Sequence, residues 1–161
     1  MAFNMATFTL IHVIISMIGI LAGLVVVGGL MAGVRYNGWI ATYLATTILT
    51  NATGFGFPFV VLMPSHILGV ISLVILPFAV VALYLKHLAG KWRATFVVIT
   101  VTALYFNVFV LMVQLFRKVP AMIALAPTQK EPPFAVTQLI ILALFIVLGR
   151  AAVRGFREER A

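Results

Sequence analysis

The stretch FTLIHVIISMIGILAGLVVVGGLMAGV, residues 8–34, is apolar almost throughout and carries no charged side chain. A helix needs roughly 20 mostly apolar residues to cross about 30 Å of hydrocarbon, so this stretch is long enough to span a membrane. It is too long for the apolar core of a signal peptide, and no Lys or Arg precedes it. We therefore expect it to be kept as a membrane helix.

The composition of the whole chain agrees with that reading. The 161 residues are 64% hydrophobic and 9% charged, with a mean hydropathy of +1.22. Soluble domains average about 45–50% apolar and about 25% charged residues. These values exclude an ordinary soluble fold, and they also exclude disorder, which requires low hydrophobicity and high charge.

Four further apolar stretches follow the first, and none alternates strictly as a membrane β-strand would. The sequence therefore predicts an all-α integral membrane protein with five transmembrane helices in a single domain over residues 1–161. The predicted spans are about residues 8–34, 39–57, 65–85, 94–116 and 134–148.

Two connections leave alternatives open. Gly54, Gly56 and Pro58 interrupt the end of the second span, so residues 54–64 could form a re-entrant segment and the chain would then cross four times. The longest connection, residues 117–133, is rich in proline, which breaks a continuous helix. We expect it to be an outer surface loop, with a lid over the helix ends as the alternative.

The distribution of cations predicts the orientation. With five crossings, one side receives Arg35, Lys86, Lys91, Arg93, Arg150, Arg154, Arg157 and Arg160, and the other receives only Arg117, Lys118 and Lys130. Cytoplasmic loops carry the excess of Lys and Arg, so the N-terminus is expected outside and the C-terminus in the cytoplasm of a bacterial plasma (inner) membrane. The net charge of +8 follows this topology pattern, and we expect the lipid bilayer, not a nucleic acid, as partner.

Small and hydroxylated residues mark the packing faces. Gly19–Gly23 and Gly29–Gly33 are small-xxx-small pairs, which let helix backbones approach closely in lipid. The second span carries a threonine stripe at Thr42, Thr46, Thr50 and Thr53. Its hydroxyls are expected to bond back to the preceding turn or to join helices, with a ligand or pore lining as the alternative. Asn107 lies near the bilayer centre, where its amide needs a partner on another helix.

Several polar residues are predicted to share one depth near the outer interface. His12 and His66 each lie about one turn inside a helix that enters from that side, and Asn51 and Thr53 close the second span there. Gln114 and Gln138 lie about one turn from the same interface. The five-helix arrangement thus predicts a polar layer under the outer loop.

That layer limits the chemistry that the chain could support. Two imidazoles at one depth are the minimum for bis-imidazole ligation of haem b, and they also suit copper and other late metals, so His12 and His66 are the candidate metal ligands. Gln114, Gln138 and Asn51, with the two histidines, could instead donate to the carbonyls of a quinone. A hydrogen-bonded structural pair is the third interpretation.

The chain has no cysteine and no aspartate, and its glutamates lie at Glu131, Glu158 and Glu159, so no intramembrane carboxylate is available for proton or cation coupling.

Three functions therefore remain open. The first is a redox-associated membrane subunit that binds haem b or a quinone at the polar layer. The second is a non-catalytic scaffold or accessory subunit, working as a homo-oligomer or within a larger complex. The third is a transporter or channel for a neutral small solute.

Two local patterns resemble known membrane proteins. The segments Thr50–Phe59, Pro64–Gly69 and Asn107–Pro120, with Ala124–Thr128 and Glu131–Phe134, are similar to a group of small integral membrane proteins of proteobacteria without an assigned activity. The Pro-x-His start at Pro64–His66 is distantly similar to small haem-b membrane cytochromes. An additional inner-leaflet histidine pair, usual in those cytochromes, is missing here.

Overall fold

The computed structural model describes residues 4–58 and 63–157, and within them every regular element is helical. The elements are α1 (Met5–Met31), α2 (Asn37–Gly54), α3 (Pro64–Val80), a π-helical turn η1 (Val81–Leu85), α4 (Lys91–Lys118), α5 (Pro120–Leu125) and α6 (Pro132–Gly155). The prediction of an all-α protein is confirmed for this part of the chain.

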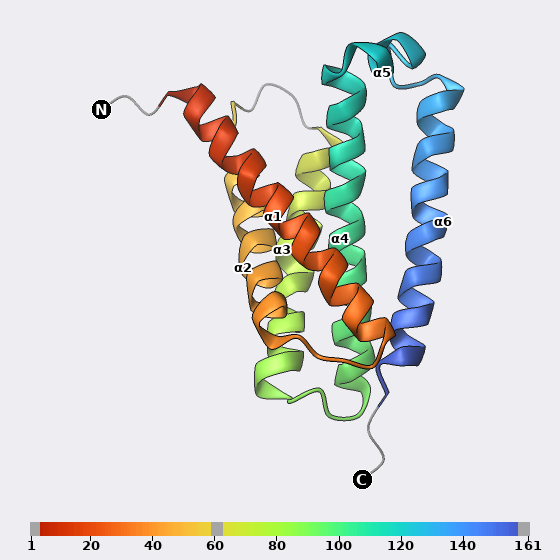
Figure 1. Cartoon of the computed structure of the whole chain (residues 1–161). Helices are drawn as coiled ribbons and strands as arrows, with labels where there is room; N and C mark the ends of the chain where they lie inside the picture. Colours follow the sequence, from red (N-terminus) through yellow and green to blue (C-terminus); the bar gives the residue numbers. More distant parts are fainter. Residues whose placement is uncertain (1–3, 59–62, 158–161) are drawn as a thin grey trace.

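The long helices form a bundle in which successive helices run in opposite directions (Figure 1). α1 crosses the bundle diagonally, α2 returns beside it, α3 and α4 follow as an antiparallel pair, and α6 stands at the edge (Figure 1). The short α5 lies across one end. As a result, the start of α1, the end of α2, the start of α3, the end of α4 and the start of α6 all lie at that same end.

Among the described residues, four helices are long and apolar enough to cross a membrane: α1, α3 with η1, α4 and α6. The chain is therefore a multi-pass membrane protein by length and composition of its helices. α2 is not one of the four, although its 18 residues are long enough, because the threonine stripe together with Asn37 and Asn51 makes it too polar.

Several helix ends differ from those expected. α1 stops at Met31, before the predicted residue 34, because Gly33 adopts a positive φ of 74° that a helix does not accommodate. α6 begins at Pro132 and continues to Gly155, well past residue 148, because Arg150 and Arg154 end the apolar run without ending the helix. α5 occupies part of the connection predicted as loop. The proposed re-entrant segment includes residues 59–62, which lie outside the described residues.

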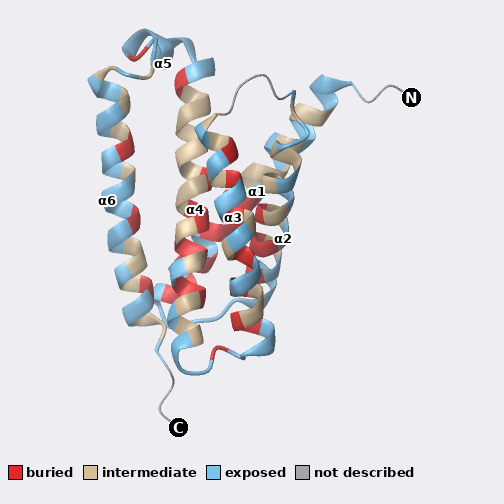
Figure 2. Cartoon of the chain, turned by 180° about the vertical axis from the view of Figure 1, so that it is seen from behind, coloured by how far each residue is buried: buried red, intermediate tan, exposed pale blue. Residues whose placement is uncertain are grey.

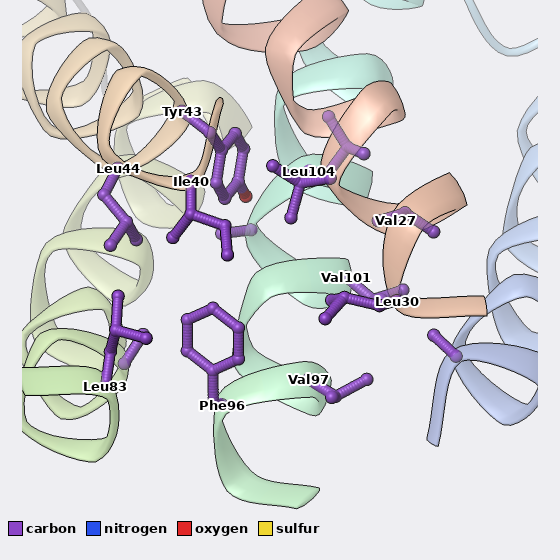
Figure 3. Close-up of a cluster of buried hydrophobic side chains, with 14 of the residues drawn as sticks. Val27, Leu30, Ile40, Tyr43, Leu44, Leu83, Phe96, Val97, Val101 and Leu104 are labelled. Atoms are coloured by element: carbon purple, nitrogen blue, oxygen red, sulfur yellow. The ribbon is translucent and has the colours of Figure 1, made fainter. Parts of the chain in front are cut away.

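The buried core joins α1, α2, α4 and the end of α3 with η1, and Phe145 and Ala152 of α6 belong to it as well (Figure 2). Figure 3 shows Ile40 and Tyr43 of α2 lying toward Phe96 and Leu104 of α4. Tyr43 is fully buried, and its hydroxyl donates to the carbonyl oxygen of Thr100 on α4 at 2.8 Å. Helices α1, α2 and α4 are thus joined mainly by apolar packing around one polar contact.

Three of the four predicted glycines leave room on α1 for a neighbouring side chain, as the small-xxx-small pattern predicts. A Cβ atom built on Gly19 would lie 3.1 Å from the Thr46 hydroxyl oxygen, and one on Gly23 would lie 2.6 Å from Leu104 Cδ1 and 2.8 Å from Tyr43 Cε2. Gly29 is filled in the same way by the ring of Tyr36. Gly33 lies beyond α1 and does not belong to this face.

We expect Gly23→Ala to destabilise the protein, because the added methyl group overlaps both Tyr43 and Leu104. Overpacking of this kind costs about 1–3 kcal/mol, against a gain of about 1 kcal/mol for replacing a helical glycine by alanine. Gly28→Ala is the matched control, since nothing lies within 4 Å of a Cβ at Gly28. Thermal unfolding in detergent should give a lower Tm for the first variant and an equal or higher Tm for the second. Equal Tm values for the two variants would contradict this packing.

Candidate functional site

His12 of α1 is bonded to the last turn of α2. Its Nδ1 lies 2.8 Å from the hydroxyl oxygen of Thr53. That hydroxyl donates to the carbonyl oxygen of Leu49 at 2.7 Å, and it has only one hydrogen. With that hydrogen on Leu49, Nδ1 is the donor to Thr53, and in this tautomer the lone pair of the neutral ring lies on Nε2. The sequence placed both residues at one depth, and the structure joins them directly.

Aromatic rings surround the His12 side chain. The ring of Phe57 lies edge-on to the imidazole with centroids 5.1 Å apart, and Phe8 packs on Phe57 at 5.0 Å. Sequence reasoning did not single out Phe8 or Phe57. The available signal was the spacing of Phe8 one turn before His12, which places the two on the same side of α1.

His66 occupies the third position of α3 and caps that helix. Its Nδ1 accepts a hydrogen bond from the backbone N–H of Met63 at 3.1 Å, so in the neutral ring the proton lies on Nε2. The side chain is buried, at 6% exposure, and its ring lies 6.1 Å from the ring of Phe55 on the α2 side. Pro64 at the helix start was the sequence signal for this cap, because proline favours the first turn.

Asn51 of α2 faces α3 near Gly69. Its Nδ2 donates to the carbonyl oxygen of Thr47 at 2.7 Å within α2. Gly69 of α3 leaves room for both Phe55 and Asn51, whose nearest atoms would be 3.5 Å and 3.7 Å from a Cβ at that position. Asn51 and His66 therefore belong to the α2–α3 contact, whereas His12 belongs to the α1–α2 contact.

The two glutamines lie in another part of the same end. Gln138 of α6 is 9% exposed, and its Nε2 donates to the Phe109 carbonyl oxygen of α4 at 3.4 Å. Its buried Oε1 has no hydrogen-bond partner among the described residues. Gln114 is half-buried on α4. The contacts thus separate Gln138, which lies between α4 and α6, from a histidine group on α1, α2 and α3.

The connection between α4 and α6 lies over the ends of these two helices. α5 and the residues after it cross the ends of α4 and α6, while α1 begins on the other side of the bundle (Figure 1). Gln129 donates to the Val113 carbonyl oxygen of α4 at 2.8 Å, and the Glu131 carboxylate accepts from the Thr128 hydroxyl at 2.8 Å. The bond from Thr128 holds the pKa of Glu131 below its ordinary value. A lid over His12 is therefore not the arrangement seen.

The threonine stripe is explained mostly by local bonds. The hydroxyls of Thr42, Thr46 and Thr53 each donate to a carbonyl four residues earlier. Thr50 is the exception, because its buried hydroxyl has no partner within the described chain.

The expectation that Asn107 finds a partner on another helix is wrong for its Nδ2, which is buried and has no partner among the described residues.

No protein-family model, curated protein or solved structure matches this chain. In the described ranges, no group of three or more His, Cys, Asp or Glu side chains lies close enough together to hold a metal ion. The resemblance to small proteobacterial membrane proteins stays a prediction, and the site is interpreted from its own contacts.

We expect Thr53→Val to weaken the α1–α2 contact, because it removes the acceptor of the His12 N–H while keeping the side-chain shape. Side-chain hydrogen bonds between membrane helices contribute about 0.6 kcal/mol on average and at most about 1.7 kcal/mol. A double-mutant cycle with His12→Ala, measured by unfolding in detergent, should return a coupling energy in this range. Thr42→Val is the control, since its hydroxyl bonds only to Gly38 of its own helix. Additivity of the two single changes would refute the contact.

Proposed function

We propose that this chain is a five-pass accessory protein of a bacterial plasma membrane, with no catalytic site of its own. The observation that carries the proposal is the hydrogen bonding of the two imidazoles: His12 Nδ1 is committed to Thr53, and His66 Nδ1 is committed to Met63. Each bond fastens a helix end, so both histidines have a structural role. This is the arrangement expected of a hydrogen-bonded pair of packing residues.

The proposed topology includes α2 as a fifth crossing, although its composition alone does not qualify it. α2 runs beside α1 and packs against α3 over its length, so these neighbours can shield its polar groups from lipid. The connections that carry Arg35 and Lys86, and the end of α6 with Arg154, lie at one end of the bundle (Figure 1). Positive residues mark the cytoplasmic side, so this end is cytoplasmic in the proposed topology. The start of α1 lies at the opposite end and is therefore outside.

The absence of cysteine from the chain allows a direct topology test. A single cysteine at Thr128 should react in intact cells with a membrane-impermeant maleimide, because the outer connection faces the periplasm in this topology. Cysteines at Arg35 and at His87 should react only after the cells are opened. Labelling of Arg35Cys and His87Cys from opposite sides would contradict five crossings and support four.

The proposed partner surface is the outward face of α6. Only 17% of the most apolar window of α6 is buried, against 33% for each of the other three spans. Val136, Ile140 and Val147 recur on this face and are 51%, 63% and 63% exposed. A helix with so few contacts inside its own bundle is available to a second copy or to another membrane subunit.

A quinone-type ligand at His12 is a second candidate. The lone pair on His12 Nε2 can accept from a quinol hydroxyl, and the rings of Phe8 and Phe57 suit a flat head group. Haem b is less well supported, because bis-imidazole ligation needs a lone pair from both histidines. His66 uses its Nδ1 lone pair for the Met63 N–H, and its neutral ring then carries a proton at Nε2.

Transport of a neutral solute is the least supported function. It would require the threonine hydroxyls to face a path, whereas those of Thr42, Thr46 and Thr53 bond within their own helix.

Purification in mild detergent separates these functions. For an accessory protein we expect no Soret band and no stoichiometric quinone in an organic extract analysed by mass spectrometry.

A photo-crosslinking residue at Ile140 should give a defined product in native membranes, while one at Val74, which is 59% exposed on α3, serves as control. A Soret band, or a quinone lost in His12→Ala, would overturn the proposal in favour of a redox subunit. Equal crosslinking from both positions would remove the α6 surface.

A further inference from the structure

A groove runs between α4 and α6 on the half of the bundle that ends with the arginines of α6. It has a volume of about 690 Å³ and is lined mainly by apolar side chains, with Val101 and Tyr105 on α4 and Phe145 on α6 among them. Gly149 deepens it, because no side chain fills the space in front of Val101, whose Cγ1 would lie 3.4 Å from a Cβ at that position. Figure 2 shows how little of α6 is buried beside this groove.

Two cations stand at one end of the groove. Arg150 and Arg154 both line it, and their spacing of four residues places them on one side of α6. Both side chains are exposed. Within residues 4–58 and 63–157 the only carboxylate belongs to Glu131, which lies at the opposite end of α6. The groove therefore combines an apolar body with a positive end.

The dimensions of the groove match one leaflet of a bilayer. The α6 residues that line it run from Leu142 to Arg154, about 18 Å at 1.5 Å per residue. One leaflet contributes about half of a hydrocarbon core of about 30 Å. A single acyl chain lying along α6 would thus extend from the bilayer midplane to the level of the arginines.

We propose that this groove binds an anionic phospholipid, with an acyl chain between α4 and α6 and the phosphate on Arg150 and Arg154. Basic pockets between helices at the membrane surface are suited to anionic head groups, and the guanidinium group matches a phosphate in charge and geometry. A free phosphate would leave the apolar length of the groove unused, and a partner helix would leave the two charges unpaired. This inference goes beyond the accessory role proposed above and does not depend on it.

The test uses the full chain in detergent, with phosphatidylglycerol as the probe. Native mass spectrometry and the shift in Tm on adding the lipid should both report binding to the wild-type chain, and phosphatidylcholine and inorganic phosphate should give no comparable shift. Arg150→Gln with Arg154→Gln should lower the affinity for phosphatidylglycerol by about tenfold or more, the effect of two cations near an anionic head group. Gly149→Leu should reduce binding by filling the groove without a change of charge.

Arg35→Gln with Lys91→Gln is the matched control, because both residues are exposed and lie outside the groove and the charge lost is the same. This double variant should bind phosphatidylglycerol as the wild type does. Equal loss of binding in both double variants would overturn the proposal, because it would indicate attraction by net charge alone. So would an equal Tm shift with phosphatidylcholine or with inorganic phosphate. Crosslinking from Ile146 to a second copy, with no lipid retained, would show that a protein fills the groove instead.

Discussion

The contact of Tyr43 with α1 and α4 holds the bundle together. The tyrosine ring fills the space that Gly23 leaves on α1, and its hydroxyl donates to the Thr100 carbonyl oxygen on α4. Lipid offers no water to satisfy a buried hydroxyl and no hydrophobic driving force between helices. Close packing against a glycine, together with one interhelical hydrogen bond, supplies the association that apolar surfaces alone would not. Helices α1, α2 and α4 meet at this residue, and α3 packs around them.

The Tyr43 contact also helps to explain how the polar helix α2 is held within an apolar bundle. Its threonines and asparagines make it too polar to qualify as a span by composition. The hydroxyls of Thr42, Thr46 and Thr53 bond within the helix, and the bond between Thr53 and His12 fastens its last turn to α1. The histidines have a similar role, because each one bonds to a polar group at a helix end in an apolar environment. Joint ligation of a metal or haem, one of the three interpretations of the histidines, would require His66 to give up the hydrogen bond that it accepts from Met63.

α6 is less buried within the bundle than the other spans. It contacts α4 and the end of α1, where Gly155 packs directly on the backbone of Met31, and it leaves most of its surface to the surroundings. The face that carries Ile140 and the groove that ends at Arg150 and Arg154 are separate parts of that surface. A peripheral helix of this kind can associate with protein on one side and lipid on the other, and the two proposals for it are tested by different variants.

The sequence by itself determined the class of the protein and the position of its helices along the chain. Long runs without charge, such as the one around His12, have only one stable form in lipid, because the backbone must satisfy its own hydrogen bonds. It also placed Gly19 and Gly23 on a packing face, since helical periodicity alone decides which residues share a side. Only the tertiary structure decided which polar groups meet. Depth in a bilayer is one coordinate, so His12, His66, Gln114, Gln138 and Asn51 could be assigned to one level. The separation of Gln138 from His12, His66 and Asn51 depends on the lateral order and tilt of the helices. These follow from side-chain packing between segments far apart in the chain.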